Sequence, residues 1–347
     1  MRIGDFKETY ASDQSVFANP TSRFWLGVLY LGLMVFPFVA GDYFLFMANL
    51  IGITIIGAVG LNILTGFAGQ ISLGHAAFIG VGGYTAAILS TRFNLPLLVC
   101  LPLSGLMSAA FGIIVGGPSL RLKGMYLCIA TLSAQLILEF VFVHWESMTG
   151  GIRGMNLPPP HIFGIALDND FNYYFLTLFM VIVCVTAARN LFRTRVGRAF
   201  IAIRDRDISA ELMGINLPRY KTYAFAISSF MAGLSGCLWV NFLKSVTPEH
   251  FPLLESIRYL AMIIVGGMGS ILGSILGAIF MTVVPEVIKT GLGFLVSVFP
   301  TAMSFLFPCQ QVIFGLLIVI FLVVEPHGLA EIWRRIKNYF HLWPFEH

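Results

Sequence analysis

Five polar side chains stand inside long apolar runs of this sequence: Asn62, Gln70, Ser72, His75 and Gln135. Amides, a hydroxyl and an imidazole exchange hydrogen bonds, and each costs free energy in apolar surroundings unless it has a partner. Gln70 and Ser72 adjoin a glycine-containing break, where freed backbone groups are tolerated only if they are buried or line a water path. We expect the five to line a translocation path. The alternative is hydrogen bonding between helices, worth about 0.6 kcal/mol per bond, and for His75 alone this alternative is favoured.

Gln135 and Glu139 are one helical turn apart and share a face. A carboxylate at membrane depth costs roughly 2.5–3.5 kcal/mol. Glu139 is therefore either a path residue or close enough to the outer surface to be hydrated, and the nearby His144 and Glu146 favour hydration.

The sequence lacks the motifs of the common catalytic sites. It contains no GxxxxGK[ST], HExxH or GxSxG, and its seven histidines and five cysteines show no ligand spacing. We expect no enzyme active site, no metal site and no cofactor bound by this chain.

Composition places the chain in a membrane. It is 57% hydrophobic and 11% charged, whereas soluble domains carry roughly 25% charged residues. Apolar runs near the 20-residue length of a span predict an all-α integral membrane protein. The runs are residues 24–40, 44–64, 71–90, 95–116, 125–143, 171–188, 223–242, 257–288 and 305–324.

The run 257–288 is too long for one span and contains Gly266, Gly267 and Gly269. We expect it to cross twice, as two short segments hinged at these glycines. The protein then has about 8–10 transmembrane or re-entrant helices, and both termini face the cytosol. Gly69–Gly74 also echoes Gly269–Gly273, which suggests a possible internal inverted repeat with paired interrupted helices.

Residues 189–221 carry eight of the 21 Lys and Arg residues of the chain. The positive-inside rule places this loop in the cytosol. Asp207 as N-cap, 208–213 as body and Gly214 as the end predict a short helix. Six residues do not hold a helix alone in water, so its apolar side, Ile208, Leu212 and Met213, needs a surface from the membrane domain or from a partner. A solvated loop whose arginines only fix topology is the alternative.

We expect the chain to form a single transmembrane domain (1–347), and charge divides the rest of it. Residues 1–23 form a polar cytosolic N-terminal segment, and 144–170 form an outer loop with Asp168, Asp170 and a single base, Arg153. Residues 325–347 form a cytosolic tail, whose basic, aromatic stretch 332–340 should lie along the inner membrane surface.

Several segments resemble the signature motifs of branched-chain amino acid ABC transporter permeases. They are LNILTGFAGQISLGHAAFIGVGGYTAA (61–87), SLRLKGMYLCIATLSAQLILE (119–139), SMTGGIRG (147–154), GRAFIAIRDRDISAELMGINLPRYK (197–221), ESIRYLAMIIVGGMGSILGSILGA (255–278) and VVEPHGL (323–329). The motifs stand in family order from about residue 44 to 330. One departure is Leu136, near which many relatives carry an acid.

The resemblance implies a binding-protein-dependent importer in a bacterial or archaeal cytoplasmic (inner) membrane. Its expected partners are a second permease chain, two ATP-binding subunits and an extracytoplasmic solute-binding protein, with ATP and Mg²⁺ on the ATPase subunits. Residues 204–214 align with the coupling helix of the family. The residues expected to couple to the ATPase are Arg204, Asp205, Arg206, Asp207, Glu211 and Gly214.

The resulting hypothesis is a permease for branched-chain or other apolar amino acids, driven by ATP hydrolysis on separate subunits. The first alternative is the same machine importing urea or short amides. The second is a stand-alone secondary carrier or channel, which the scarcity of titratable groups in the spans disfavours.

Overall fold

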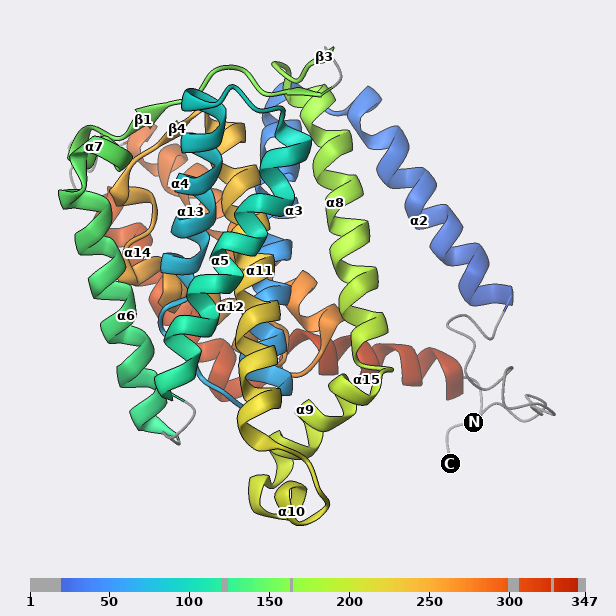
Figure 1. Cartoon of the computed structure of the whole chain (residues 1–347). Helices are drawn as coiled ribbons and strands as arrows, with labels where there is room; N and C mark the ends of the chain where they lie inside the picture. Colours follow the sequence, from blue (N-terminus) through green and yellow to red (C-terminus); the bar gives the residue numbers. More distant parts are fainter. Residues whose placement is uncertain (1–19, 120–123, 163–164, 299–305, 326–327, 343–347) are drawn as a thin grey trace.

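The computed structural model describes residues 20–119, 124–162, 165–298, 306–325 and 328–342, and this part of the chain is a bundle of helices (Figure 1). The expected N-terminal segment 1–23 lies outside it except for residues 20–23. Six described helices are long and apolar enough to cross a membrane, which confirms an all-α integral membrane protein. They are α3 (Asp42–Asn62), α5 (Leu97–Ser119), α6 (Met125–His144), α8 (Asp170–Leu191), α11 (Leu217–Leu243) and α13 (Ile271–Val298).

Four further helices complete the segments expected from the sequence. They are α2 (Pro20–Val39), α4 (His75–Arg92), α12 (Leu253–Gly266) and α14 (Leu306–Val324).

The short elements are divided between the two ends of the bundle (Figure 1). At one end lie α9 (Arg195–Asp205), α10 (Asp207–Leu212) and α15 (Leu329–Leu342), and we name this the α10 end. At the opposite end, β1 (Met155–Asn156) pairs antiparallel with β4 (Ser245–Val246). The same end holds α7 (Glu146–Thr149), η2 (Gly151–Arg153), β2 (His161–Ile162), β3 (Ile165–Ala166) and η3 (Pro248–His250).

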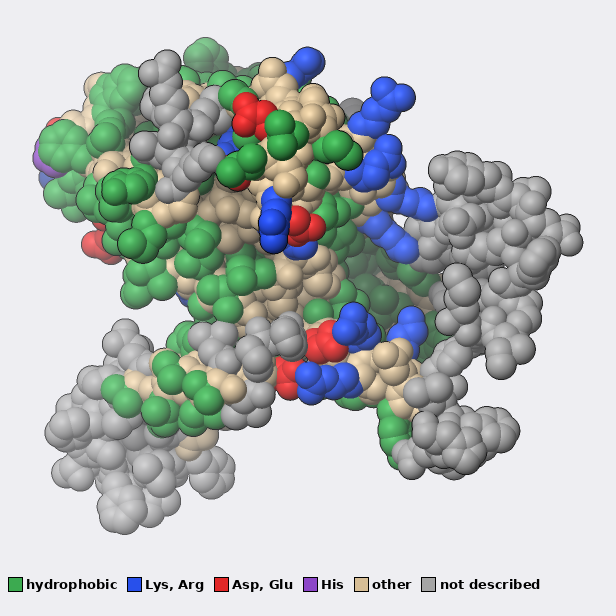
Figure 2. Space-filling view, turned by 90° about the horizontal axis from the view of Figure 1, so that it is seen from below, with side chains coloured by type: hydrophobic (Ala, Val, Ile, Leu, Met, Phe, Trp, Pro, Cys, Tyr) green, Lys and Arg blue, Asp and Glu red, His purple; other side chains and the backbone are tan. Residues whose placement is uncertain are grey.

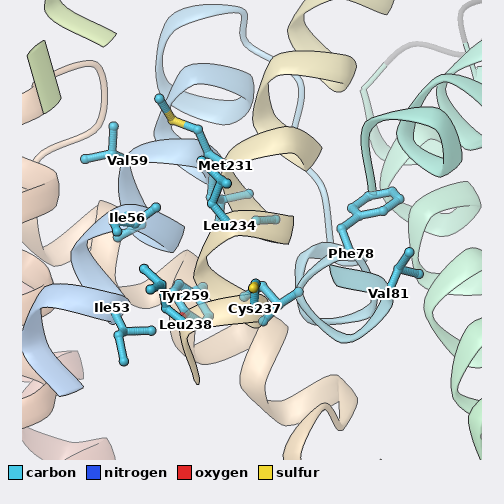
Figure 3. Close-up of a cluster of buried hydrophobic side chains, with 14 of the residues drawn as sticks. Ile53, Ile56, Val59, Phe78, Val81, Met231, Leu234, Cys237, Leu238 and Tyr259 are labelled. Carbon is cyan, nitrogen blue, oxygen red and sulfur yellow. The ribbon is translucent and has the colours of Figure 1, made fainter. Parts of the chain in front are cut away.

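The core forms where α11 packs against α3, α4 and α5. Figure 3 shows apolar side chains of α3, α4, α11 and α12 meeting there, among them Ile56, Phe78, Leu238 and Tyr259. Small residues permit the approach: a Cβ on Gly82 of α4 would overlap the backbone of Gly233 in α11. Lipid provides no hydrophobic drive between helices, so close backbone packing of this kind is a main source of their association.

The first interruption lies between α3 and α4. A π-helix, η1 (Ile63–Phe67), extends α3, and residues 68–74 are then non-helical, with Gly69 at φ +67°. The expected third span, 71–90, therefore begins later, at His75. The break expected at 66–70 is also displaced, because the π-helix continues α3 through Phe67.

The chain re-enters helix well inside the membrane. His75 Nε2 donates to the carbonyl oxygen of Gly57 at 2.9 Å. Gly57 stands ten residues before Phe67, so α4 begins about 15 Å from the α10 end of α3. The buried polar residues of this non-helical segment, Gln70 and Ser72, require internal hydrogen-bond partners.

The second interruption precedes α12. A Cβ on Gly80 or Gly83 would lie 3.2 Å from the Phe251 ring, so the chain descends from β4 to the middle of α4 before α12 begins. The turn between α12 and α13 then contains Gly267 at φ +114° and Gly269 at φ +78°. Only one of the two expected short segments is short, because α12 has 14 residues and α13 has 28.

The two helices that follow an interruption are not the two that the similarity of Gly69–Gly74 to Gly269–Gly273 suggested. Ile271 opens the continuous helix α13, whereas α4 follows the non-helical residues 68–74 and α12 follows η3 and residues 251–252. The helices α4 and α12 run in opposite directions: α4 ends where Arg92 bonds to Ser147 of α7, far from the α10 end, and α12 ends beside the α10 end. The internal inverted repeat stays a prediction.

Candidate coupling surface and membrane pathway

The loop between α8 and α11 folds into two short helices. The Thr194 hydroxyl caps α9 by accepting from the Gly197 amide at 3.4 Å. Arg206, at φ −157°, is extended and serves as the N-cap residue of α10, so Asp207 is the first residue of the helix rather than its cap. The Asp207 carboxylate accepts from the next amide, Ile208 N, at 2.9 Å. Gly214, at φ +84°, follows the end of the helix as expected.

One side of α10 packs against the rest of the protein, and the other side is exposed. Ala210 is 4% exposed and packs with Ile203 of α9 and Leu217 of α11. Leu212 and Met213 are 84% and 86% exposed, and Ile208 is exposed as well. The helix is at the tip of the molecule (Figure 1), on the face where Lys and Arg side chains gather (Figure 2). The membrane domain does not cover the apolar side of α10, so this side is available to a partner.

Arg204 connects this loop to the first interruption. Its Nη1 donates to the Gly66 carbonyl oxygen at 3.0 Å, while Nε and Nη2 donate to Asp205 Oδ1. A Cβ on Gly269 would lie 2.7 Å from Arg204 Nη1. The arginine therefore contacts both the π-helix and the α12–α13 turn.

Asn62, at the end of α3, is buried and bonds to the same α12–α13 turn and to the start of α13. Its Nδ2 donates to the Ser270 carbonyl oxygen at 2.8 Å and to Ser274 Oγ at 2.7 Å. Its Oδ1 accepts from the Gly269 amide at 2.9 Å. The buried amide thus fastens the end of α3 to the start of α13.

Gln135 of α6 bonds both to α4 and to α12, and also to Phe251, which precedes α12. Its Oε1 accepts from the Ala77 amide at 2.7 Å and from Ser256 Oγ at 3.2 Å, and its Nε2 donates to the Phe251 carbonyl oxygen at 2.9 Å. Ser256 Oγ also accepts from the Ala76 amide at 2.8 Å. Helix N-termini leave backbone amides without intrahelical partners, and here Gln135 and Ser256 satisfy two of those of α4.

The other expected path residues lie along the re-entering chain. His75 bonds to Gly57 and lies edge-on to the Tyr259 ring, with centroids 5.3 Å apart. Ser72 Oγ accepts from the Gly74 amide at 3.3 Å. Gln70 is buried, and its Nε2 has no hydrogen-bond partner among the described residues. Four of the five expected residues are thus bonded within the chain in this conformation, and their place in a path stays a prediction.

The predicted hinge glycines stand at one corner of the fold. Gly266 ends α12, and Gly267 and Gly269 have the positive φ values that the turn requires. Gly328, before α15, packs on this corner, because its Cβ would lie 2.5 Å from the Gly267 amide nitrogen. Hinge motion at this corner remains a prediction.

Two charged residues on α12 were not singled out from the sequence. Arg258 Nη1 lies 3.6 Å from Glu255 Oε2, and Arg258 Nη2 donates to the Met281 carbonyl oxygen at 3.2 Å. The signal was present, since Arg258 falls inside the apolar run 257–288, where a charge is costly.

Comparison with known proteins identifies the family. Residues 43–322, from α3 almost to the end of α14, match the model of the branched-chain amino acid transport system / permease component family. The chain belongs to this family. The matched part of this permease includes both interruptions and the α9–α10 loop, and it leaves out α2 and α15.

Individual relatives of this permease include proteins named LivM and LivH. The high-affinity branched-chain amino acid transport system permease protein LivM of Escherichia coli K12 is 30% identical over 91% of this chain and 77% of its own length. LivM of Salmonella typhimurium is 32% identical over 77% of this chain and 68% of its own. The probable branched-chain amino acid transport permease protein LivH of Methanocaldococcus jannaschii is 26% identical over 74% and 82%. No solved structure matches the chain.

Proposed function

We propose that this permease is the membrane subunit of an ABC importer for branched-chain or other apolar amino acids. ATP hydrolysis on separate subunits, which bind the ATP and Mg²⁺, drives the transport. The observation that carries the proposal is α10, a short helix held on one side and apolar and exposed on the other. The names of the relatives support the amino acid substrate.

The distribution of charge supports an orientation in the cytoplasmic (inner) membrane in which the α10 end faces the cytosol. The loop 189–221 and the α15 residues Arg334, Arg335 and Lys337 place many basic residues at that end. The positive-inside rule assigns such an end to the cytosol. Both chain termini would then be cytosolic.

The partners follow from the family and from α10. Relatives named LivM and LivH occur in the same organism, Methanocaldococcus jannaschii, which supports a pair of related permeases. Two ATP-binding subunits would receive α10 in a groove, and a solute-binding protein would deliver the amino acid at the β1–β4 end.

The contacts suggest how force would travel. Closure of the ATPase dimer pushes α10, and α9 moves with it because Ala210 and Ile203 pack together. Arg204 then displaces Gly66 and the Gly269 turn, to which Asn62 is also fastened. The helices α4 and α12 meet at Gln135, so their rearrangement would open or close a path at mid-membrane.

Glu211→Lys tests the coupling. Glu211 is exposed on α10, so the substitution changes the docking surface without disturbing the spans. In proteoliposomes with the complete complex, we expect ATP hydrolysis to persist while ATP-driven leucine uptake falls at least about tenfold, the effect of 1.4 kcal/mol of lost coupling.

Asn338→Lys, on an exposed site of α15 at the same end, is the control and should leave uptake unchanged. Wild-type uptake by Glu211→Lys would refute the coupling role of α10. Competition by urea rather than leucine in the wild-type complex would refute the amino acid substrate.

A further inference from the structure

We propose that Glu255 and Arg258 on α12 form a binding site for the charged ends of a zwitterionic amino acid inside the translocation path. The inference rests on the proposed function and specifies where the solute is held. Glu255 would bind the ammonium group and Arg258 the carboxylate. Neither residue belongs to the set expected from the sequence.

Both residues stand near the middle of the membrane. Arg258 and Glu255 precede Gly266, at the α10 end of α12, by eight and eleven residues, or about 12 and 16 Å. The Met281 carbonyl that Arg258 contacts is ten residues into α13, about 15 Å from the same end. A hydrocarbon core is about 30 Å thick, so the pair is far from both surfaces.

The side chains of Glu255 and Arg258 are partly exposed on the surface of this chain at this depth. The side chains of Arg258 and Glu255 are 36% and 26% exposed. Each charge facing lipid at the membrane centre would cost roughly 2.5–3.5 kcal/mol by insertion scales. The face is therefore covered by water or by protein in the membrane, as the wall of a path between two permease chains would be.

The two groups retain binding capacity. Their nitrogen–oxygen distance of 3.6 Å is longer than the roughly 2.7–2.9 Å of a charge-assisted hydrogen bond. A guanidinium has five N–H donors, and the contacts with Glu255 and Met281 leave others for a ligand. An incoming carboxylate can take a bidentate position on Arg258.

The surroundings select the class of solute. One positive and one negative group, one helical turn apart, complement a molecule with both charges and favour neither anions nor cations. Leu254 and Ile257 are exposed beside the pair and offer apolar contact to an aliphatic side chain. Ser256, between them in sequence, bonds to Gln135, so the site is attached to the junction of α4 and α12.

The test is the double variant Glu255→Gln/Arg258→Gln in the complete complex, reconstituted in proteoliposomes and supplied with leucine. Removing both partners of an ion pair leaves no uncompensated charge, so a purely structural pair predicts nearly unchanged transport. The proposal predicts that ATP-driven leucine uptake falls by tenfold or more, because two charge-assisted contacts with the solute are lost. The second permease should still co-purify.

The matched control is Glu286→Gln/Lys289→Gln, which neutralises another ion pair at the same spacing on α13 and should leave uptake unchanged. Arg258→Lys is a second variant, which keeps the charge but loses the bidentate geometry. We expect it to raise the KM for leucine about tenfold with kcat unchanged.

Unchanged uptake by the double variant, or an unchanged KM for Arg258→Lys, would overturn the site. Loss of the second permease from the purified double variant would also overturn it, by assigning the pair to the subunit interface. These outcomes are distinct from failure of the proposed function, which shows as a wild-type complex that does not take up leucine.

Discussion

At the scale of residues, single side chains fasten backbone segments that are far apart in sequence. Asn62 bonds to Gly269, Ser270 and Ser274, and Gln135 bonds to Ala77, Ser256 and Phe251. Sequence reasoning found both amides because they are polar groups in apolar runs. It could not find their partners, because nothing local relates Gln135 to a carbonyl 116 positions away.

Asn62→Ala should destabilise this junction. The substitution leaves the Gly269 amide and the Ser274 hydroxyl without that partner, and an unsatisfied buried group costs about 1–3 kcal/mol. We expect a lower midpoint of thermal unfolding in detergent. Asn338→Ala, at an exposed position on α15, is the control, and equal midpoints for the two variants would contradict the role of Asn62.

At the scale of elements, the interruptions decide how much the sequence could predict. The π-helix η1 continues the helical chain to Phe67, beyond the expected end of this span at residue 64. α13 continues past the expected end at residue 288 to Val298, and Glu286 and Lys289 form an ion pair within the helix. The spans, the short helix α10 and the glycine corner were predictable, since each has a local signal in apolar length, capping residues or glycine.

The close packing of α4 on α11 gives a prediction at this scale. A Cβ on Gly236 would overlap the Ile79 carbonyl, whereas a Cβ on Gly32 of α2 meets nothing within 4 Å. Gly236→Ala should therefore reduce stability by roughly 1–3 kcal/mol, the usual cost of overpacking. Gly32→Ala should be neutral or slightly stabilising, as alanine is in a helix. Thermal unfolding of the two variants, measured side by side, checks the difference.

The exposed side of α10 gives a second prediction at the scale of elements. Leu212→Ser/Met213→Ser alters side chains that the membrane domain leaves exposed, so stability of the isolated permease should not change. Binding of the ATPase subunits should weaken, because the apolar contact surface is lost. Co-purification from detergent-solubilised membranes measures this, and undiminished recovery of the ATPase subunits would place their contact elsewhere.

At the scale of the whole molecule, charge asymmetry fixes the expected orientation. Met213→Cys should react with a membrane-impermeant thiol reagent only from the cytosolic side, and Asp168→Cys only from the outer side. The native Cys100, Cys184 and Cys237 are buried, whereas Cys128 is partly exposed, so the labelling is done in a Cys128→Ser background. Labelling of position 213 from outside intact cells would show that α10 faces outward, which is the opposite of the expected orientation.

In the proposed function, this permease is a solute conduit whose energy comes from another polypeptide. Leucine uptake into proteoliposomes, measured for the complete complex and for this chain alone, tests it most directly. We predict uptake that requires both ATP and the ATPase subunits, with none above background for the chain alone. Leucine flux through the purified chain without an ATPase would contradict the account.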